Sequence, residues 1–388
     1  MPESLKFQRP AAFLTNSRSS TRSLVVMTAT SRKSSMNASA IIRQRLYNQK
    51  LASSEFRAPA DVVRWLGAVQ SQDFNAAKWA LAMRMRDGIN AGIQGAYDRG
   101  EILRTHVLRP TWHFVTPEDI CWMLKLTAPR VNVRCGPNYR KLELDEKIFK
   151  RSNKAIATAL KGGKHLTRAE LKTVLNRAGV DANDSIRLGH LLLRAELDAL
   201  VCSGPLSGKQ FTYALLEERV PPAPAFTHDE ALAKLTQRYF ASHGPATLAD
   251  FVWWSGLTTN DARRGIASVD RHLEKAEVDD TAYWTATAAA PRSLPSAHLL
   301  PAFDEYNVAY KNRQLVFDSA NTTNWDALGP TMIVDGRIIG TWKSTLNKNH
   351  VSITLNPSRS LKRREQLALT AAADQYAAFL GVALQLRC

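Results

Sequence analysis

Two glutamines separated by one residue, Gln70 and Gln72, are the side chains whose type and spacing point most directly to a site. A glutamine amide offers a carbonyl acceptor and two N–H donors, so a fixed pair can hold a water molecule and direct a dipole at a developing positive charge. An amide has no proton to give and no negative charge. Glutamine is also a good helix former, and two glutamines at a helix end are commonly only solvated surface. These residues alone leave both interpretations open.

The glutamines stand at the end of an apolar segment, and we expect a helix over residues 59–72 to carry them. Pro59 suits the first turn of that helix, because its missing N–H would be unpaired there in any case. The surrounding pattern predicts helices from residue 40, over 76–85 and over 90–99, then strands over 102–107 and 112–115. Helices closed by a hairpin are typical of a winged-helix unit.

The same order of elements returns twice further along the chain. Thr167–Leu171 is a capping box, in which Thr and Glu satisfy each other's backbone donors, and Thr247–Phe251 repeats it 80 residues later. A weaker first copy is Ala58–Val62, which would place the helix with the two glutamines in register with a helix of each later unit. A hairpin is predicted after each later copy, over 201–213 and 272–287. We therefore expect three tandem winged-helix units.

The C-terminal region is predicted to be rich in strands. Asp335-Gly336 is a hairpin turn signal, a strand is expected over 351–355, and a helix over 362–380 closes the chain. The expected fold is α+β and helix-rich, with three tandem winged-helix-turn-helix units, a small C-terminal β barrel or sheet, and a terminal helix. The predicted limits are 1–38 for a disordered basic extension, 39–130, 131–222 and 223–290 for the three units, and 291–388 for the C-terminal region.

The charge balance points to a polyanionic partner. Lys and Arg number 52 against 35 Asp and Glu, a net charge of +17 over 388 residues, which favours nucleic acid first and an anionic membrane second. No apolar run approaches the roughly 18 residues of a membrane span, so membrane insertion is not expected. We read the four cysteines as free thiols in a reducing compartment, because they lack metal-type spacing: Cys121, Cys135, Cys202 and Cys388.

Residues 1–38 are rich in Ser, Thr and Arg, and this composition cannot bury a core. Two interpretations compete for them. One is an organellar transit peptide, and the other is an extension upstream of a natural start at Met27 or Met36. The sequence shows no clear amphipathic helix in this segment, which favours the extension.

Other candidate sites carry weaker signals. Asp304-Glu305 is an acidic pair for which a cap or a salt bridge is a better prediction than a metal site. His106 and His113 lie on the first predicted hairpin, where packing or a phosphate contact is more common than chemistry. Trp253-Trp254 is expected to place one indole in the core and one at its rim. The sequence contains no phosphate-binding glycine loop, nucleophile elbow or His-Glu-x-x-His motif.

Three motifs in order resemble the winged-helix DNA glycosylases of the AlkZ and YcaQ type. They are Gln70–Asp73 followed by Ala77–Leu81, the hairpin Leu108–His113, and Leu300–Tyr306, within a similarity that spans about residues 40–385. The resemblance implies winged-helix units that line a concave basic surface, and a catalytic glutamine-x-glutamine motif, here Gln70 and Gln72. The YcaQ branch ends this motif in Asp, so the chain resembles the AlkZ branch, whose substrates include bulky alkylations and interstrand crosslinks through purine N7. Ser71 departs from the usual hydrophobic middle residue.

Amide side chains suit a base that is already cationic. Cleaving a base from deoxyribose passes through an oxocarbenium-like transition state, for which most enzymes use an acid and a carboxylate. A purine alkylated at N7 leaves as a neutral molecule and needs no acid. We expect Gln72 to hold the attacking water with Gln70 as its partner, and Asp73 to cap or pair locally. No lysine stands in the motif to form a Schiff base, so we predict a monofunctional DNA glycosylase, a hydrolase of N-glycosyl bonds.

Double-stranded DNA with alkylated purines is the expected partner of a monomer without cofactor or metal. Candidate DNA contacts are Arg104, Arg109, Lys209 and Lys343 for phosphates, with Trp112 and His113 as a wedge or lesion probe. The expected location is cytoplasmic, at the nucleoid, unless residues 1–38 direct the chain to an organelle. The main alternative is a non-catalytic winged-helix regulator or architectural DNA binder, and a third is a binder that sequesters the alkylating drug or its adduct.

Overall fold

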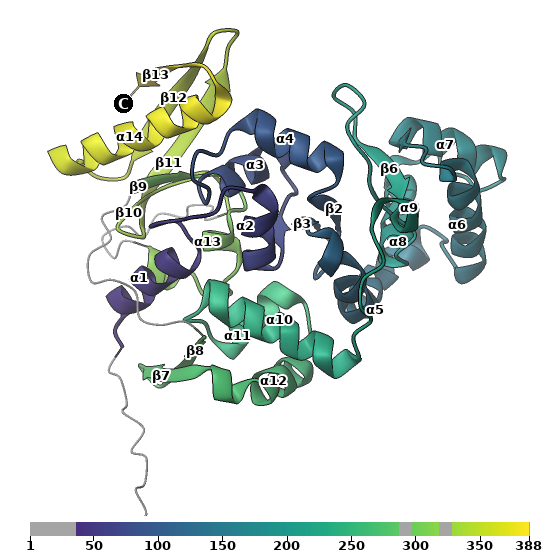
Figure 1. The fold of residues 1–388 in the computed structure, drawn as a ribbon, viewed down its shortest axis with the longest axis horizontal. Helices are drawn as coiled ribbons and strands as arrows, with labels where there is room; N and C mark the ends of the chain where they lie inside the picture. Colours follow the sequence, from purple (N-terminus) through teal and green to yellow (C-terminus); the bar gives the residue numbers. More distant parts are fainter. Residues whose placement is uncertain (1–35, 287–296, 318–327, 388) are drawn as a thin grey trace, which may run out of the picture. The chain divides into compact units, whose positions relative to one another are not determined.

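The computed structural model describes residues 36–286, 297–317 and 328–387, so most of the predicted basic extension lies outside the described residues. These residues form an α+β fold (Figure 1). No helix among them is both long and apolar enough to cross a membrane. The helices are α1 (Ala38–Asn48), α2 (Pro59–Leu66), α3 (Phe74–Ala82), α4 (Asn90–Arg99), α5 (Pro117–Lys141), α6 (Glu146–Leu160), α7 (Arg168–Arg177), α8 (Ser185–Leu197), α9 (Leu216–Arg219), α10 (His228–His243), α11 (Leu248–Ser255), α12 (Thr259–Ser268), α13 (Glu305–Val308) and α14 (Arg363–Leu380).

The described strands form four sheets. The first three are, in spatial order, β1 (Val69–Gln70), β3 (Trp112–Val115) and β2 (Leu103–His106); β4 (Leu166–Thr167), β6 (Thr212–Leu215) and β5 (Val201–Ser203); and the pair β7 (Glu274–Val278) and β8 (Thr281–Thr285). The fourth has the order β13 (Ala383–Arg387), β12 (His350–Pro357), β11 (Arg337–Leu346), β10 (Thr331–Val334) and β9 (Ala297–Leu300). The three predicted hairpins are confirmed, although residue 287 lies outside the described residues.

A short strand, two helices and a hairpin recur three times. β1 leads into α3 and α4 and pairs with β3, and β4 leads into α7 and α8 and pairs with β6. In the third copy Ala246, which is bridged to Trp284 of β8, leads into α11 and α12. The repeat therefore places α3 in register with α7 and α11. The prediction that put the segment Ala58–Val62 in that register was wrong, because it starts α2 and has no side-chain cap.

Side-chain caps fix where the three equivalent helices begin. Thr167 and Glu170 form the predicted capping box at the start of α7. Thr247 and Asp250 form the predicted equivalent at α11. At α3 the cap is Asp73, whose carboxylate accepts from the backbone N–H of Ala76 at 3.0 Å. Each cap satisfies a backbone donor that the helix leaves open, which contributes about 1 kcal/mol.

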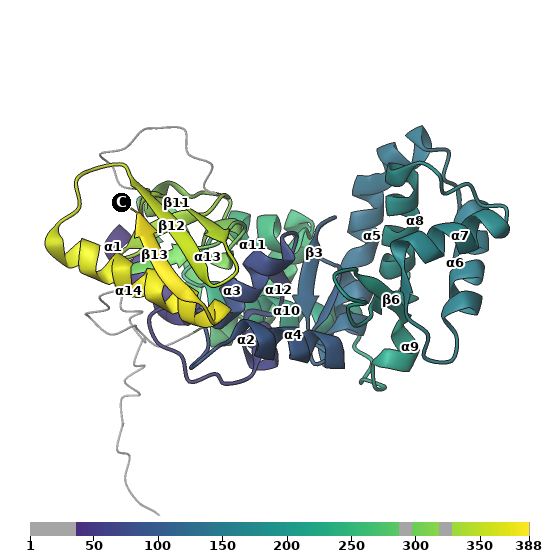
Figure 2. The same cartoon turned by 90° about the horizontal axis from the view of Figure 1, so that it is seen from above.

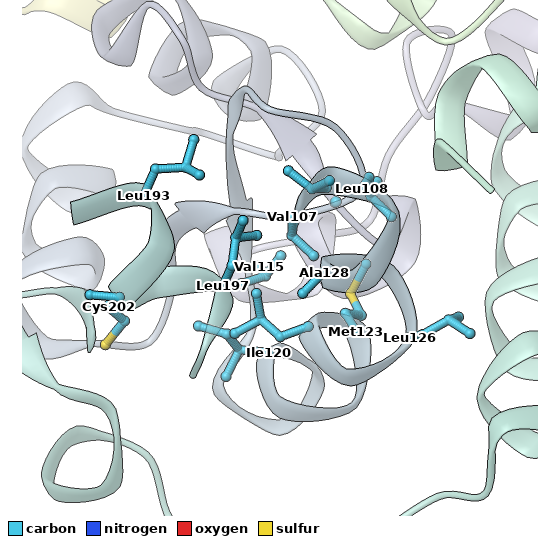
Figure 3. Close-up of a cluster of buried hydrophobic side chains, with 14 of the residues drawn as sticks. Val107, Leu108, Val115, Ile120, Met123, Leu126, Ala128, Leu193, Leu197 and Cys202 are labelled. Atoms are coloured by element: carbon cyan, nitrogen blue, oxygen red, sulfur yellow. The ribbon is translucent and has the colours of Figure 1, made fainter. Parts of the chain in front are cut away.

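The longest described helix, α5, has no counterpart in the sequence prediction, and it crosses the expected unit limit at residue 130. Pro129 and Pro137 lie inside α5, and a proline in a helix interior costs about 3 kcal/mol. Burial offsets that cost, because each large apolar side chain contributes about 1.5–3 kcal/mol when it leaves water. Figure 3 shows this face of the helix packed against the first hairpin and α8, through Ile120, Met123 and Ala128 with Val107, Val115 and Leu197.

The C-terminal sheet is covered by α14, which lies along its strands (Figure 2). Asp335 and Gly336 have positive φ values of 49° and 78°, as the predicted two-residue turn between β10 and β11 requires. The helix predicted over 362–380 is confirmed as α14. The prediction that this helix closes the chain was wrong, because the chain turns at Gly381 and returns as β13, parallel to β12.

Two hydrophobic cores meet at β1. One joins the first hairpin to α5, α6, α7 and α8 and to α10, α11 and α12. The other joins α1, α2, α3 and α4 to the C-terminal sheet and α14. Ala68 belongs to the first core and its neighbour Val69 to the second. The backbone that leads into Gln70 is therefore fixed from both sides.

Candidate active site

The motif with the two glutamines lies on a strand and the turn after it, whereas the sequence predicted the end of a helix. α2 stops at Leu66, because Gly67 takes a positive φ of 85° that a helix cannot continue. β1 begins two residues later and pairs with β3, the second strand of the hairpin. Glycine after an apolar run is a stop signal. The prediction passed over this signal because good helix formers, the two glutamines among them, follow the glycine.

Pairing with β3 fixes the backbone of the motif. Gln70 lies opposite His113 in the ladder, and the Ser71 N–H continues it by donating to the Trp112 carbonyl at 2.8 Å. Side chains alternate along a strand, so Gln70 and Ser71 point to opposite sides, and Gln72 follows in a bend. Ser71 is fully buried, and its hydroxyl has no hydrogen-bond partner within the described residues. That burial explains why a hydrophobic residue also suits this position.

Gln70 is held through its backbone and its side chain. Its N–H donates to a carboxylate oxygen of Glu305 at 2.8 Å, and its amide oxygen accepts from Nη2 of Arg109 at 2.9 Å. Arginine has only donors, so the amide oxygen must face Arg109 and the Nε2 group must point the other way. Gln70 lines a cavity. Its Nε2 has no partner among the described residues, which leaves two N–H donors for a ligand.

Arg109 ties Gln70 to α11. Its Nη1 donates to the Trp254 carbonyl at 2.7 Å, and only 8 % of the residue is exposed. Burial lowers the pKa of Arg109, and the nearby Glu305 carboxylate opposes that shift. Arginine remains charged at neutral pH. One buried cation thus connects the first hairpin, the motif and a helix that lies more than a hundred residues later.

Both histidines of the first hairpin pack inside it, which is one of the two predicted roles. His113 is fully buried, with Nδ1 2.8 Å from the Thr111 carbonyl and Nε2 3.4 Å from Nη2 of Arg109. Burial, and then the Arg109 charge, lower the pKa of His113 well below 6.5, so the ring is neutral and Nδ1 carries the proton. His106 contacts Glu196 through Nδ1 at 2.5 Å.

Gln72 is exposed and loosely held, in contrast to Gln70. Its amide oxygen accepts from the Trp112 N–H at 3.4 Å, which is long for a hydrogen bond. The next residue, Asp73, is the N-cap of α3, as the sequence predicted. The weak contact leaves the Gln72 side chain free to turn toward a ligand.

The acidic pair after β9 is buried and fully used inside the protein. Asp304 binds Arg84 through both oxygens at 2.8 Å and caps α13, which confirms the predicted cap or salt bridge. Glu305 accepts from the Gln70 N–H with one oxygen and from the indole N–H of Trp254 with the other, the latter at 3.0 Å. Sequence reasoning missed the link between Glu305 and Gln70, which are 235 residues apart. Only the motif that contains the acidic pair pointed to this segment.

A cavity of about 710 Å³ opens beside Gln70. Its walls come from the turn between β2 and β3, from α11 and from the segment 303–311, and most of the lining side chains are apolar. Trp253 lines it and is 40 % exposed, whereas Trp254 is buried, as predicted for this pair. Within the described residues, no group of three His, Cys, Asp or Glu side chains could hold a metal ion.

Comparison with known proteins places this arrangement in a family. Residues 63–379 match the family described as DNA glycosylase AlkZ-like. The chain belongs to this family. It is therefore a DNA glycosylase, and the glutamine motif, the first hairpin and the acidic pair all lie within the matched residues.

Two individual proteins resemble this glycosylase along most of its length. A curated protein of Streptomyces sahachiroi, named interstrand DNA cross-link repair glycosylase, is 24 % identical over 341 residues, which cover 77 % of this chain and 85 % of that protein. The solved structure of the Streptomyces sahachiroi DNA glycosylase AlkZ covers 91 % of this chain and 100 % of its own, with 21 % identity and a TM-score of 0.75. The second comparison shows that the two proteins share a fold.

Arg104 of this glycosylase, predicted to contact phosphate, is instead engaged within the protein. Its guanidinium lies 4.2 Å from the ring centroid of Trp112 and 4.6 Å from that of Phe211. Its Nε donates to the Ser71 carbonyl at 3.0 Å. Burial lowers the pKa of Arg104. These contacts place Arg104 against the middle residue of the motif, where it holds the backbone between the two glutamines.

Two other predicted phosphate contacts are exposed. Lys209 lies at the tip between β5 and β6, and Lys343 lies on β11. Of the predicted wedge residues, Trp112 is partly exposed and His113 is not. The predicted DNA contacts thus divide into a buried set that positions the motif and an exposed set that is free to meet phosphates.

Proposed function

We propose that this glycosylase hydrolyses the N-glycosidic bond of purines alkylated at N7, including bulky adducts and interstrand crosslinks, and leaves an abasic site. One observation carries the proposal: each carboxylate next to the motif is hydrogen-bonded within the protein, and both positions of the motif itself carry neutral amides. Asp73 caps α3, and both oxygens of the buried Glu305 accept hydrogen bonds from the protein. Two neutral amides then face the substrate. Such a site suits a base that departs without being protonated.

The cationic base supplies the driving force for bond cleavage. When the C1′–N9 bond breaks, its electron pair goes to the base, which leaves as a neutral molecule. The sugar develops oxocarbenium character, the oxygen of a water molecule forms a bond to C1′, and the water proton passes to solvent. In this mechanism the loosely held amide oxygen of Gln72 accepts a hydrogen bond from that water molecule. The hydrogen bond orients the water so that a lone pair on the water oxygen points at C1′.

Gln70 acts as a donor in the proposed mechanism. Arg109 occupies its amide oxygen, so the free Nε2 group offers N–H donors rather than the carbonyl dipole expected from the sequence. A donor beside the departing base stabilises the electron density that the base gains as the bond breaks. The buried contacts with Glu305 and Arg109 fix this donor before the substrate binds. Fixed polar groups need no reorganisation during the reaction.

Two findings support the substrate class, one from the comparisons and one from the sequence motif. The name of the Streptomyces relative concerns interstrand crosslinks, and Gln72 at the end of the motif agrees with the AlkZ branch. Membership of a glycosylase family argues against both non-catalytic alternatives, the regulator or architectural protein and the adduct-sequestering binder.

DNA binding is proposed to use three winged-helix units in one chain. The threefold repeat of strand, helix pair and hairpin supports this arrangement, in which the expected limit near residue 130 falls within α5 and the one near 222 falls after α9. Lys209 and Lys343 contact phosphates, and Trp112 probes the lesion. A monomer is sufficient, because a single chain presents all three units. The proposed location is cytoplasmic, at the nucleoid.

Release of free 7-methylguanine from a duplex with one alkylated guanine tests the proposal. Chromatography quantifies the released base, and an aldehyde-reactive probe counts the abasic sites. We expect release by the wild-type protein, slower release by Gln70→Ala and Gln72→Ala, and no protein–DNA adduct after borohydride treatment. Failure of the wild type to release the base would refute the activity. Release at the wild-type rate by both variants would refute the site but leave the activity standing.

A further inference from the structure

We propose that the cavity beside Gln70 is a subsite for an uncharged, planar aromatic group attached to N7 of the damaged purine. The inference rests on the proposed function, because it assigns a place to the part of the adduct that is not the base. Gln70 belongs both to the catalytic motif and to the cavity lining. A group in the cavity would therefore lie directly beside the bond to be cut.

The cavity is much larger than a small lesion requires. Its volume of about 710 Å³ lies in the range of sites that bury drug-sized ligands. A methyl group on N7 would leave nearly all of this space empty. The lining is mainly apolar, with Val252 and Trp253 on α11 and Phe303 and Val308 among the other contributors. Size and lining together fit a ligand of several fused rings.

Trp253 presents its indole to the cavity in a fixed orientation. The indole N–H donates to the Val308 carbonyl at 2.9 Å, and the Arg313 guanidinium lies 5.4 Å from the ring centroid. The residue nevertheless remains 40 % exposed. Aromatic rings gain from offset stacking beyond the area they bury, so an exposed indole that cannot rotate is suited to stack a planar group.

The cavity walls are held at a fixed separation. Arg109, at the turn between β2 and β3, donates to the carbonyls of Trp253 and Trp254 on α11, at 3.4 and 2.7 Å. At the end of α11, a Cβ added to Gly256 would stand 2.1 Å from the Leu108 carbonyl oxygen, so this close approach requires glycine. A cavity that already exists costs little conformational entropy to fill.

The charges around the cavity select against a cationic occupant. Arg109, Arg134 and Lys311 are its charged lining residues, and no Asp or Glu lines it within the described part of the chain. Arg134 and Lys311 are exposed, so they can attract the phosphates of the DNA that carries the adduct. A cationic group would be repelled from the same place. An uncharged aromatic group on DNA satisfies both conditions.

Two substrates and a variant with a filled cavity distinguish a defect in the subsite from a defect in the motif. The substrates are duplexes with a single 7-methylguanine or with a single guanine that carries a pyrenylmethyl group at N7. Ala249 is exposed and lines the cavity from α11, so Ala249→Trp fills it. Ala267 is exposed on α12 and does not line the cavity, so Ala267→Trp is the matched control.

We expect Ala249→Trp to slow single-turnover release of the pyrenylmethyl base by about 10- to 100-fold, the equivalent of one lost stacking contact. Release of 7-methylguanine by Ala249→Trp should stay at the wild-type rate, and Ala267→Trp should release both bases normally. Equal slowing of both substrates by Ala249→Trp would overturn the subsite. Normal release of both substrates by that variant would also overturn it.

A binding measurement decides the subsite independently of catalysis. Pyrene fluorescence should be quenched when the pyrenylmethyl duplex binds, because the pyrene stacks on Trp253, and Trp253→Leu should remove this quenching. Quenching that persists unchanged in Trp253→Leu would overturn the subsite. If the wild-type protein releases neither base, the proposed function fails, and the fluorescence titration still decides whether the cavity takes the aromatic group.

Discussion

The first two repeats of strand, helix pair and hairpin have the same topology but different surroundings. In each, a two-residue strand pairs with the second strand of a hairpin and leads into a capped helix, at Asp73 in the first repeat and Thr167 in the second. Arg109 at the first hairpin tip is buried against α11, whereas Lys209 at the second tip is exposed. One architecture thus gives a fixed site in one place and a free loop in the other.

The difference comes from partners that lie far along the chain. Arg109 reaches α11 across 145 residues, and Gln70 reaches Glu305 across 235. In the second repeat, the space around Gly208, next to Lys209, is open. Both tips carry a basic residue, so charge alone does not tell them apart. Tertiary anchoring distinguishes a tip that holds the Gln70 amide from one that is exposed to solvent.

Replacing the basic residue at each tip should give the largest contrast between the repeats. Arg109→Met leaves the Trp254 carbonyl and the Gln70 amide oxygen without a donor and removes a positive charge near the buried Glu305, so we expect unfolding free energy to fall by about 3–5 kcal/mol. Lys209→Met should change it by less than about 0.5 kcal/mol. Urea unfolding compares the two. Similar losses in both variants would contradict the anchoring role of Arg109.

A second contrast concerns the residue just before each helix cap. Gln72→Ala should lower the single-turnover rate of base release by about 100-fold, or about 3 kcal/mol of activation free energy, because the attacking water loses its acceptor. Gln72 is exposed, so its thermal unfolding should not change. Leu166→Ala, at the equivalent position of the second repeat, serves as the control and should release the base at the wild-type rate. A matching loss in Leu166→Ala would show that the rate reports stability instead of chemistry.

His113 on the first hairpin should also make the folding stability depend on pH. Burial holds the pKa of His113 well below 6.5, whereas the unfolded chain binds that proton near pH 6.5. Stability from this group is therefore complete above pH 6.5 and falls as the pH drops below it, by about 1.4 kcal/mol per pH unit. His113→Phe should remove this contribution from unfolding curves recorded between pH 7 and 5. Burial also lowers the pKa values of His165, His190, His243 and His298, so some acid sensitivity should remain in the variant.

Short-range signals predicted much of the fold. Thr167 and Thr247 predicted the starts of their helices, because a cap depends only on residues three positions away. Asp335-Gly336 predicted a turn, because both residues tolerate positive φ. The two prolines of α5 argue against a helix at their positions. The burial that offsets their cost comes from elements distant in sequence, so local patterns do not reveal it. The stop signal at Gly67 was present, but helix propensity beyond it was given more weight.

The sequence proposed candidate site residues, but it could not predict their geometry. The motif named Gln70 and Gln72, and the acidic pair was correctly assigned to caps and salt bridges. Nothing local to Gln70 indicates that Arg109 binds its oxygen or that Glu305 binds its N–H, because both contacts depend on how the two cores meet. The same limit applies to the cavity, whose walls come from three separate parts of the chain.

The smallest expected effect tests whether local or distant contacts hold the motif. Asp73→Ala and Thr167→Ala each remove one helix cap and should each lower the unfolding free energy by about 1 kcal/mol. Asp73 directly follows Gln72, yet β1 is held by β3 and Glu305, so base release by Asp73→Ala should stay near the wild-type rate. A loss as large as that of Gln72→Ala would mean that the cap positions the motif. The difference between the two repeats would then come from the side chains where the strand meets the capped helix, and not from contacts with distant parts of the chain.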